Sequence, residues 1–542
     1  MAGTNDSRTV HTRVAIVGGG PVGLSAALVL HRFGIDSVVL DRDTGTTRHP
    51  KARGCNPRTM ELFRQWGIEA AVRSRGLPES AEPAIVVESV AGPELGRVVP
   101  EPPDRAATPA WTCHVTQDVV EEELFAAASA CPGIDLRFGH QVGAIEQDAH
   151  RAVVRAESAG GPVTVEADFV VAADGASSET RRHLGIGMVG PATLGTWAND
   201  FWQGDISGLL RGRQAVSFVV VPQDEHAPTS MLFPSGGGRY LSWTQLGPDE
   251  AADPALWTAD RVRAAIRRQL GTGDADITLL GQAVWRMSSQ LAETFRAGRV
   301  FLAGDAAHRF PPTGGLGMNT GIQDAHNLAW KLAFVLLGHA PDALLDTYEV
   351  ERRAVAQDNA DWSVGNASRI TELVAGVRSR DLDRIAFWLR DMENHIHQSG
   401  RALGFRYAAG AVVDDGTTAQ PLNSRVYEPS DRPGGRFPHL WLDLSRTQST
   451  LDWFDTALTV VGGPDSSGWE GAVEKVALET KVPLAYRRLP HLSADHGIAM
   501  GPRGAVLVRP DGHVAWRTSW VPPDQVATLS AAVTATLGGA VR

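Results

Sequence analysis

Residues 14–28 read VAIVGGGPVGLSAAL, and this stretch sets the fold class of the chain. The first four residues are an apolar run of the kind that forms a buried parallel strand, and Pro21 suits the first position of a helix. Between them, Gly18 permits a tight turn, Gly20 lets the backbone approach a pyrophosphate, and Gly23 lets helix and strand pack closely. Because the N–H groups of such a helix N-terminus face the phosphates, we predict a dinucleotide-binding α/β fold.

A second predicted strand supports the same interpretation. Residues 37–40 read SVVL, a predicted strand that leads into Asp41 and Arg42. An acidic residue roughly 20 positions beyond the glycines binds a ribose hydroxyl in dinucleotide-binding folds. Strand, glycines, helix and terminal acid therefore coincide, although this motif alone does not separate NAD from FAD.

Two later glycine motifs follow apolar runs of their own. Residues 169–181 read FVVAADGASSETR, and residues 298–325 read GRVFLAGDAAHRFPPTGGLGMNTGIQDA. They resemble the DG and GD fingerprints of the class A flavoprotein aromatic hydroxylases, which are the p-hydroxybenzoate hydroxylase-like FAD monooxygenases. The segments 403–407, 433–439 and 504–512 are similar to the longer members of that family, which include phenol hydroxylase-like enzymes and hydroxylases of aromatic polyketides.

The resemblance implies both the cofactors and the chemistry. FAD would be bound, NADPH or NADH would be a transient co-substrate, and O2 would give a flavin C4a-hydroperoxide. The expected reaction is hydroxylation of an aromatic substrate, with a polycyclic polyketide as the expected class. Two alternatives remain open: a Baeyer-Villiger-type or other ring-modifying oxygenase on the same scaffold, and a non-catalytic flavin-binding sensor. A flavin halogenase is disfavoured because the chain has no WxWxIP motif.

The resemblance also implies which residues hold FAD. Asp305 would contact the ribityl chain, Arg53 and Gln117 would contact the pyrophosphate and ribityl portion, and Asp174 would lie near the pyrophosphate. The backbone of residues 317–319 would lie at the pyrimidine edge of the flavin, where a helix N-terminus stabilises negative charge. The predicted cofactor-binding residues are Gly18, Gly20, Pro21, Val22, Gly23, Asp41, Arg42, Arg53, Gln117, Val142, Asp174, Gly304, Asp305, Pro312, Gly315, Gly317, Met318 and Asn319.

The sequence does not single out the group that assists the substrate phenol. His114, Tyr240, Arg286 and His226 are candidates, and each is more common as a surface or packing residue. Six aromatic residues would either line a pocket for a flat ligand or form an ordinary sheet core: Trp197, Trp202, Phe218, Phe233, Trp243 and Trp285. We predict no metal site.

Three domains are expected from the length of 542 residues and from the resemblance. They are a split Rossmann-like FAD-binding domain (residues 1–76, 112–184 and 281–400), a sheet-rich substrate-binding domain (77–111 and 185–280) and a thioredoxin-like C-terminal domain (405–542). Within them, residues 216–221, 230–234 and 239–244 are predicted strands, residues 261–270 a helix, and residues 1–13 a polar disordered tail.

Charge and cysteine content limit the partners. The net charge of −11 disfavours nucleic acid and anionic membranes, which call for a basic face. No apolar run approaches the roughly 18 residues of a membrane span. The chain has three cysteines, with no CxxC and none in the C-terminal domain, which excludes dithiol chemistry there. We expect a cytoplasmic monomer or homodimer whose partners are a small aromatic substrate, O2 and NAD(P)H.

Overall fold

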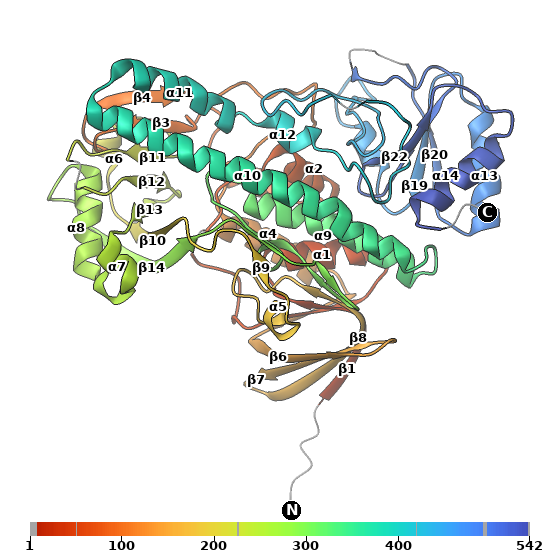
Figure 1. Cartoon of the computed structure of the whole chain (residues 1–542), viewed down its shortest axis with the longest axis horizontal. Coiled ribbons are helices and arrows are strands. Elements are labelled where there is room, and N and C mark those ends of the chain that lie inside the picture. The colour runs from red at the N-terminus through yellow and green to blue at the C-terminus, as the bar shows by residue number, and fades with distance from the viewer. Residues whose placement is uncertain (1–7, 50, 225–226, 419, 492–495, 540–542) are drawn as a thin grey trace, which may run out of the picture.

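The computed structural model describes residues 8–49, 51–224, 227–418, 420–491 and 496–539. It confirms the α/β class and contains an eight-stranded sheet, a seven-stranded sheet, a four-stranded sheet and a three-stranded sheet. In Figure 1 the eight-stranded sheet lies at the bottom, the seven-stranded sheet at the left and the four-stranded sheet at the right, and helix α10 (Ala343–Ser379) crosses the middle. None of the helices in the described part of the chain is both long and apolar enough to cross a membrane.

The eight-stranded sheet carries all three glycine motifs. Its main path runs β16-β17-β8-β1-β2-β5, and β1, β2, β5, β8 and β17 pair in parallel. Helix α1 (Pro21–Arg32) packs against α4 (Gln117–Ser129) and α9 (Gly317–Leu336). The strands are β1 (Arg8–Val17), β2 (Ser37–Asp41), β5 (Ile134–Phe138), β6 (His140–Gln147), β7 (Ala152–Ser158), β8 (Gly161–Ala172), β16 (Arg296–Ala297) and β17 (Val300–Leu302).

The expectation of a disordered tail is wrong for residues 8–13. Strand β1 begins at Arg8, and residues 8–12 pair in parallel with residues 163–167 of β8. The first half of β8 also forms an antiparallel ladder with β7, so the β7–β8 hairpin extends beyond the nucleotide-binding part of the sheet. The extension supplies hydrogen-bond partners for the backbone of the polar residues 8–12. Amino-acid composition alone does not indicate this pairing.

The seven-stranded sheet, called the covering sheet below, has the order β14-β10-β13-β12-β11-β3-β4. One face packs against helix α8 (Ala259–Leu270) through a core that includes Trp202, Phe218 and Val262. The other face packs against α10 and α11 (Leu382–Ile396) through a core that includes Val219. The strands are β3 (Ala84–Val87), β4 (Glu94–Val98), β10 (Gly195–Gln203), β11 (Phe218–Val220), β12 (Ser230–Pro234), β13 (Arg239–Gln245) and β14 (Thr278–Met287).

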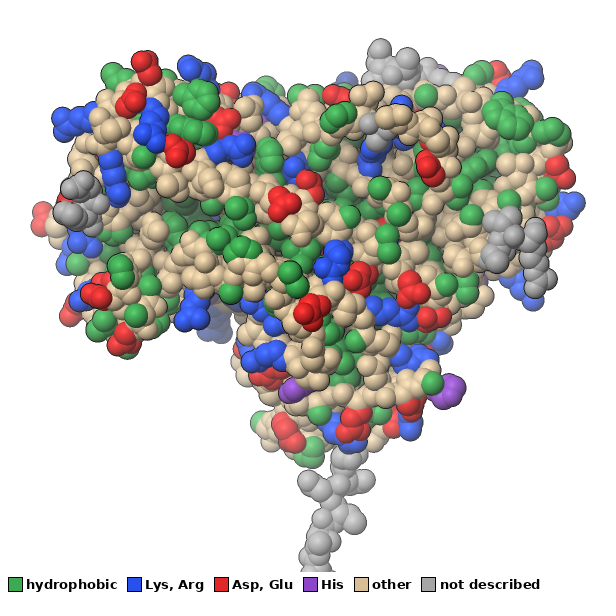
Figure 2. All heavy atoms as spheres, in the orientation of Figure 1, with side chains coloured by type: hydrophobic (Ala, Val, Ile, Leu, Met, Phe, Trp, Pro, Cys, Tyr) green, Lys and Arg blue, Asp and Glu red, His purple; other side chains and the backbone are tan. Residues whose placement is uncertain are grey.

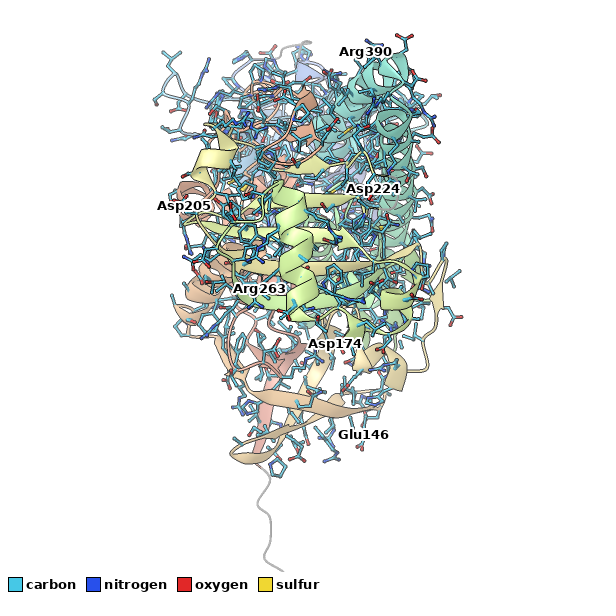
Figure 3. The ribbon with its side chains drawn as sticks, turned by 90° about the vertical axis from the view of Figure 1, so that its left-hand side faces the viewer. Glu146, Asp174, Asp205, Asp224, Arg263 and Arg390 are labelled. Atoms are coloured by element: carbon cyan, nitrogen blue, oxygen red, sulfur yellow. The ribbon has the colours of Figure 1, made fainter. Side chains whose placement is uncertain are left out.

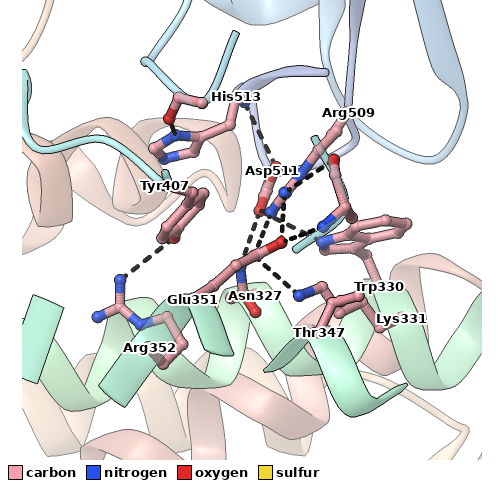
Figure 4. A network of polar contacts seen from close by, with 12 residues as sticks. Asn327, Trp330, Lys331, Thr347, Glu351, Arg352, Tyr407, Arg509, Asp511 and His513 are labelled. Carbon is pink, nitrogen blue, oxygen red and sulfur yellow. Dashed lines mark hydrogen bonds and ion pairs between the residues drawn. The ribbon is translucent and has the colours of Figure 1, made fainter. Parts of the chain in front are cut away.

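The four-stranded sheet packs on the helices that follow the third glycine motif. Its order is β20-β19-β21-β22, and its core joins Trp330 and Phe334 of α9 to Leu507 and Leu529. Close by, buried Glu351 of α10 is paired with Lys331 at 2.8 Å and with Arg509 at 2.8 Å (Figure 4). The elements are β19 (Leu458–Gly462), β20 (Leu484–Arg488), β21 (Ala505–Val508), β22 (Val514–Thr518), α13 (Gly468–Thr480) and α14 (Gln525–Thr536).

Short elements connect these layers. The three-stranded sheet has the order β18-β15-β9 and joins the two larger sheets along the chain. The remaining α-helices and strands are α2 (Pro57–Gln65), α3 (Glu69–Ser74), α5 (Glu179–His183), α6 (Ser207–Leu210), α7 (Pro248–Ala252), α12 (Ser399–Gly404), β9 (Met188–Val189), β15 (Gln290–Ala292) and β18 (His308–Arg309).

The face shown in Figure 2 carries Lys and Arg side chains interspersed with Asp and Glu side chains.

Candidate functional site

A cavity of about 1350 Å³ connects the glycine motifs to the covering sheet. Its wall includes the turn after β1, the segments after β2 and β8, the N-terminal end of α9, one face of the covering sheet, and residues of α10 and α11. Pockets for a single drug-sized ligand have volumes of roughly 300–1,000 Å³. The cavity therefore has room for a dinucleotide and a second molecule side by side.

The turn between β1 and α1 is a close-fitting backbone cradle. Gly18 has φ +107°, and a Cβ atom on it would overlap the carbonyl oxygen of Ala173. A Cβ atom on Gly23 would likewise overlap the carbonyl oxygen of Gly18. Gly20 is the N-cap of α1, no side chain caps this helix, and residues 20–22 line the cavity. The N-terminal N–H groups of α1 are thus available to an anionic group, as a pyrophosphate site requires.

Asp41 stands at the end of β2 beside this turn. One carboxylate oxygen accepts a hydrogen bond from the Gly19 N–H at 2.5 Å, and the other accepts one from the Asp43 N–H at 2.7 Å. Burial raises the pKa of Asp41, and the two backbone donors oppose that shift. Asp41 and the exposed Arg42 both line the cavity. They lie next to the glycine turn, where the sequence motif predicted them.

Asp305 and the start of α9 form the middle of the cavity wall. The Asp305 side chain is exposed to the cavity and makes no hydrogen bond or ion pair with any residue that the structure describes, while desolvation raises its pKa. Helix α9 begins at Gly317, and its first backbone bond runs from the Thr320 N–H to the Leu316 carbonyl at 2.8 Å. Residues 317–319 therefore present N–H groups without helical acceptors to the cavity.

Arg53 crosses from the loop after β2 to the covering sheet. Its Nη2 donates to the carbonyl of Pro234 at 2.6 Å and to Oγ of Ser235 at 3.1 Å, and its guanidinium lies 4.7 Å from the ring centroid of Phe233. Nε and Nη1 are buried without a protein partner, and burial lowers the pKa of Arg53 to about 9. A buried cation with two unused donors fits a site that receives an electron-rich ligand.

These observations together test whether the chain fits FAD. Glycine backbone meets the expected pyrophosphate position, an unpaired carboxylate faces the expected ribityl position, and a helix N-terminus faces the expected flavin edge. Each donor or acceptor has the chemistry that the corresponding part of FAD needs. The residues present therefore fit the cofactor.

Other predicted cofactor-binding residues lie on the same wall. Gln117, Val142, Pro312 and Gly315 line the cavity. The side chain of Gln117 is already engaged, because its oxygen accepts from the Ala52 N–H at 3.1 Å and its nitrogen donates to Glu121 at 2.7 Å.

Asp174 also lines the cavity, and its carboxylate organises the start of α5. It accepts hydrogen bonds from Oγ of Ser178 at 2.6 Å and from the Thr180 N–H at 3.0 Å. Figure 3 places Asp174 below the covering sheet, between Arg263 of α8 and Glu146 of β6. Gly23 and Gly304 do not line the cavity; a Cβ on Gly304 would lie 2.8 Å from Cγ2 of Val22, so this glycine allows the turn of the third glycine motif to approach α1.

The candidate catalytic residues are placed very differently. His114 lines the cavity, and burial, assisted by the nearby charges of Arg53 and His397, lowers its pKa to about 4. Tyr240 stacks on Trp202 with ring centroids 4.7 Å apart, in the core beneath α8 and away from the cavity. Arg286 is exposed on β14, and its neighbour Trp285 is the residue that lines the cavity. His226 lies outside the described residues.

Three of the six aromatic candidates form a wall of the cavity. Phe233, Trp243 and Trp285 line it, with centroids 4.8 Å apart for the first pair and 5.7 Å for the second. Both contacts are edge-to-face, a favourable geometry for aromatic rings. Trp202 and Phe218 instead belong to the core beneath α8, and Trp197 does not line the cavity.

Several cavity residues were not predicted. Glu121 lies one turn after Gln117 on α4, where helical spacing was an available signal. Arg369, His395 and His397 close the far side of the cavity from α10 and the end of α11. No local pattern pointed to these three, since tertiary packing alone brings α11 to the glycine motifs.

Comparison with known proteins gives consistent results. Residues 11–363 match the family model described as FAD binding domain, and residues 430–540 match the model described as aromatic-ring hydroxylase, C-terminal. The chain is 34% identical to the aklavinone 12-hydroxylase of Streptomyces purpurascens, covering 95% of this chain and 97% of that protein. It is 33% identical to the tetracenomycin A2 monooxygenase-dioxygenase of Streptomyces glaucescens, covering 97% and 96%. A crystal structure of the flavin-dependent monooxygenase PieE with FAD and substrate superimposes with a TM-score of 0.89 at 31% identity, covering 97% and 99%.

Proposed function

The chain belongs to the FAD-dependent aromatic-ring hydroxylases, and on that premise we propose that it adds one oxygen atom to a polycyclic phenol of the polyketide type. The observation that supports this substrate class most is the single cavity that runs from the glycine motifs to the wall of Phe233, Trp243 and Trp285. Edge and face contacts from such a wall suit a flat fused-ring molecule. The names of the two Streptomyces relatives, which refer to tetracenomycin A2 and aklavinone, favour the same class.

The proposed roles of the nucleotide-side residues follow from their donors and acceptors. When bound, FAD supplies the electrons from NADPH or NADH and activates O2 for transfer to the ring. The turn at residues 18–22 and the N-terminus of α1 would hold the pyrophosphate, and Asp41 would bind the adenosine ribose. Asp305 accepts hydrogen bonds from the ribityl hydroxyls. The free N–H groups of residues 317–319 stabilise negative charge at the flavin edge.

The remaining walls would position the substrate and exclude water. The covering sheet and α11 enclose the reacting ring, which limits wasteful decay of the activated oxygen. Arg53 ties the loop after β2 to the covering sheet and so fixes the distance between the two walls. Holding both reactants in this geometry is the main way in which such a site accelerates oxygen transfer.

We propose a division of labour among three parts of the chain. Residues 1–76, 112–184 and 281–400 bind FAD, residues 77–111 and 185–280 cover the substrate, and residues 405–542 buttress α9 and α10. The buried ion pairs of Glu351 support the last role, because they join the C-terminal sheet to the helices behind the cavity. Strand β14 runs from Thr278 to Met287 and so crosses the proposed boundary at residue 281.

Rapid-mixing kinetics would test the proposed function. The FAD-loaded protein is mixed anaerobically with NADPH or NADH, with and without emodin, alizarin or 1-naphthol, and flavin reduction is followed. We expect one of these phenols to accelerate reduction and, in air, to gain one oxygen atom on a ring carbon by mass spectrometry and NMR. If the product instead carries the new oxygen between a carbonyl carbon and its neighbouring carbon, the reaction is a Baeyer-Villiger insertion and not a hydroxylation. FAD binding without ligand-dependent reduction by any of the three phenols would contradict the proposal.

A further inference from the structure

Four histidines line the cavity among the residues that the structure describes, and three of them have protein partners. Nδ1 of His140 lies 3.0 Å from the Phe138 carbonyl, Nε2 of His395 lies 2.9 Å from an Asp391 carboxylate oxygen, and Nε2 of His397 lies 3.0 Å from the Val99 carbonyl. His114 is the exception. Its ring makes no hydrogen bond or ion pair with a described residue, and neither nitrogen is sealed from the cavity space.

The backbone around His114 is fixed beside the loop that precedes α2. The neighbouring residue Cys113 exchanges two backbone hydrogen bonds with Cys55, at 2.8 and 3.0 Å. As a result, a Cβ atom on Gly54 would lie 3.5 Å from Nδ1 of His114. The Gly54 carbonyl in turn accepts a hydrogen bond from Nδ2 of Asn319 at 3.0 Å. The imidazole is therefore separated by one loop from the N-terminus of α9, where the flavin edge is proposed.

The electrostatic surroundings keep this imidazole neutral. Desolvation lowers the pKa of His114 to about 4, and the charges that face it, Arg53 and His397, act in the same direction. Near neutral pH one ring nitrogen therefore carries an unused lone pair that points into a space bounded by protein. An acceptor without a partner at such a place fits a ligand that donates a hydrogen bond.

We propose that His114 is a catalytic residue that accepts the phenolic proton of the aromatic substrate during oxygen transfer. The oxygen–oxygen bond of the activated O2 breaks as the new carbon–oxygen bond forms, so that one oxygen atom joins the ring and the other leaves to become water with the two electrons from NAD(P)H. The ring then develops positive charge, and the phenolic O–H becomes strongly acidic. The O–H bond then breaks, its electron pair stays on the substrate oxygen as a C=O group, and the proton bonds to the imidazole nitrogen. When the attacked carbon later loses its own proton to the departing oxygen, the imidazolium returns its proton to the substrate oxygen, and both the aromatic ring and the neutral imidazole are restored.

The inferred role has a physical requirement that His114 meets. A base with a pKa of about 4 is too weak to ionise a resting phenol, yet it suffices for a ring oxygen that has become acidic in the transition state. A neutral imidazole next to Arg53 also avoids placing a second positive charge in the cavity before the reaction begins. The inference rests on the proposed function, because it assigns a step within it.

The test compares His114→Gln with wild type and with His150→Gln, which alters an exposed histidine in the turn between β6 and β7. FAD content and the rate of ligand-stimulated flavin reduction establish that each variant is folded and loaded. Single-turnover hydroxylation is then measured over a range of pH with the panel phenol that the wild-type enzyme turns over, beginning with alizarin. Hydrogen peroxide released per NADPH reports uncoupled turnover.

We expect His114→Gln to bind FAD and to be reduced normally, but to hydroxylate about 100-fold more slowly near neutral pH. The deficit should shrink as the pH rises and the phenol ionises, because a phenolate needs no base. Equal hydroxylation rates for His114→Gln and wild type, or a deficit that does not change with pH, would overturn the inference while leaving the proposed function intact. Absence of hydroxylation by wild-type enzyme would instead refute the proposed function.

Discussion

The guanidinium of Arg436 donates two hydrogen bonds to the carboxylate of Glu61, from Nη2 at 2.5 Å and from Nε at 2.9 Å. Both side chains are buried. Burial alone would raise the pKa of Glu61, but Arg436 and Arg58 hold it below its usual value. Glu61 belongs to α2, which follows the loop of Arg53 and Gly54. This pair therefore anchors the loop on the cavity wall to the segment that leads into the C-terminal sheet.

Glu61→Gln should destabilise the protein strongly, because it leaves the Arg436 guanidinium buried without its anion. Breaking a buried pair in this way costs about 3–5 kcal/mol. Urea unfolding of the FAD-loaded protein measures the change, and the Glu61→Gln, Arg436→Met double variant should recover part of it. The matched control is Glu122→Gln, which breaks an exposed pair with Arg75 and should cost at most about 1 kcal/mol. Equal losses for the buried and exposed pairs would contradict the anchoring role.

Gly18→Ala should abolish FAD binding. The added Cβ would overlap the carbonyl oxygen of Ala173, so the turn after β1 and the start of the second glycine motif would have to separate. Gly34→Ala is a close control, since Gly34 also has a positive φ, at +73°, but nothing lies within 4 Å of its Cβ position. Both variants carry the backbone strain of about 1–2 kcal/mol, so only the overlap differs. FAD per protein after gel filtration distinguishes them, and full loading of Gly18→Ala would refute the cradle.

Trp285→Ala should weaken binding of a polycyclic phenol without affecting FAD. Loss of aromatic contacts worth about 0.5–1.5 kcal/mol corresponds to a roughly two- to twelvefold rise in Kd or KM. Arg286→Ala changes the next residue of β14, whose side chain is exposed and does not line the cavity, and it should leave both constants within about twofold. Ligand titration by flavin fluorescence provides the comparison. A larger effect of Arg286→Ala than of Trp285→Ala would contradict the assignment of Trp285, and not Arg286, to the cavity side of β14.

Stability should fall when the protein is acidified below pH 6.5. His326 on α9 and His513 beside the C-terminal hairpin are buried, and desolvation lowers the pKa of each to about 3 from the ordinary value of 6.5. Above pH 6.5 neither state gains a proton, so neither histidine contributes. Below pH 6.5 these two histidines are protonated in the unfolded chain but stay neutral in the folded chain. Each histidine therefore reduces the unfolding free energy by up to about 1.4 kcal/mol per pH unit.

Urea midpoints between about pH 7.5 and pH 5 measure this dependence. His326→Phe should reduce the slope of the unfolding free energy against pH by the contribution of one histidine. Glu351, whose pKa its ion pairs lower to about 2 despite its burial, loses its contribution only at more acidic pH, below the ordinary value of 4.5. A midpoint that does not change between about pH 7 and pH 5 would contradict the neutral state of both histidines.

The local parts of the fold were predictable because short-range physics determines them. The strand 230–234 is confirmed as β12, and the predicted helix 261–270 is confirmed as α8 with a start two residues earlier. Both carry regular apolar spacing and end at turn residues. Strand β1 was predicted only from residue 14, since the polar residues before it pair with a hairpin that no local pattern reveals.

The same difference between local motifs and long-range contacts applies to the candidate site. The glycine motifs led to the predicted FAD-binding residues, whose roles remain predictions, and most of these lie on one cavity wall. On the opposite wall, three of the aromatic candidates from the sequence line the cavity, but the part that α10 and α11 contribute was not predictable, because it depends on contacts between residues far apart in the chain. His397 comes from the end of α11, and Arg436 meets Glu61 across 375 positions. His114 was one candidate among four in the sequence. It is set apart because it lines the cavity, as Tyr240 and Arg286 do not, and because its ring has no partner there among the described residues.

The most direct test of the account is the fate of isotopically labelled oxygen. The FAD-loaded enzyme is given NADPH and the phenol that accelerates flavin reduction under ¹⁸O₂, and the product is analysed by mass spectrometry. The account predicts one ¹⁸O atom on a ring carbon of the product for each NADPH consumed. NADPH oxidation that yields only hydrogen peroxide, or a product whose new oxygen comes from water, would contradict it.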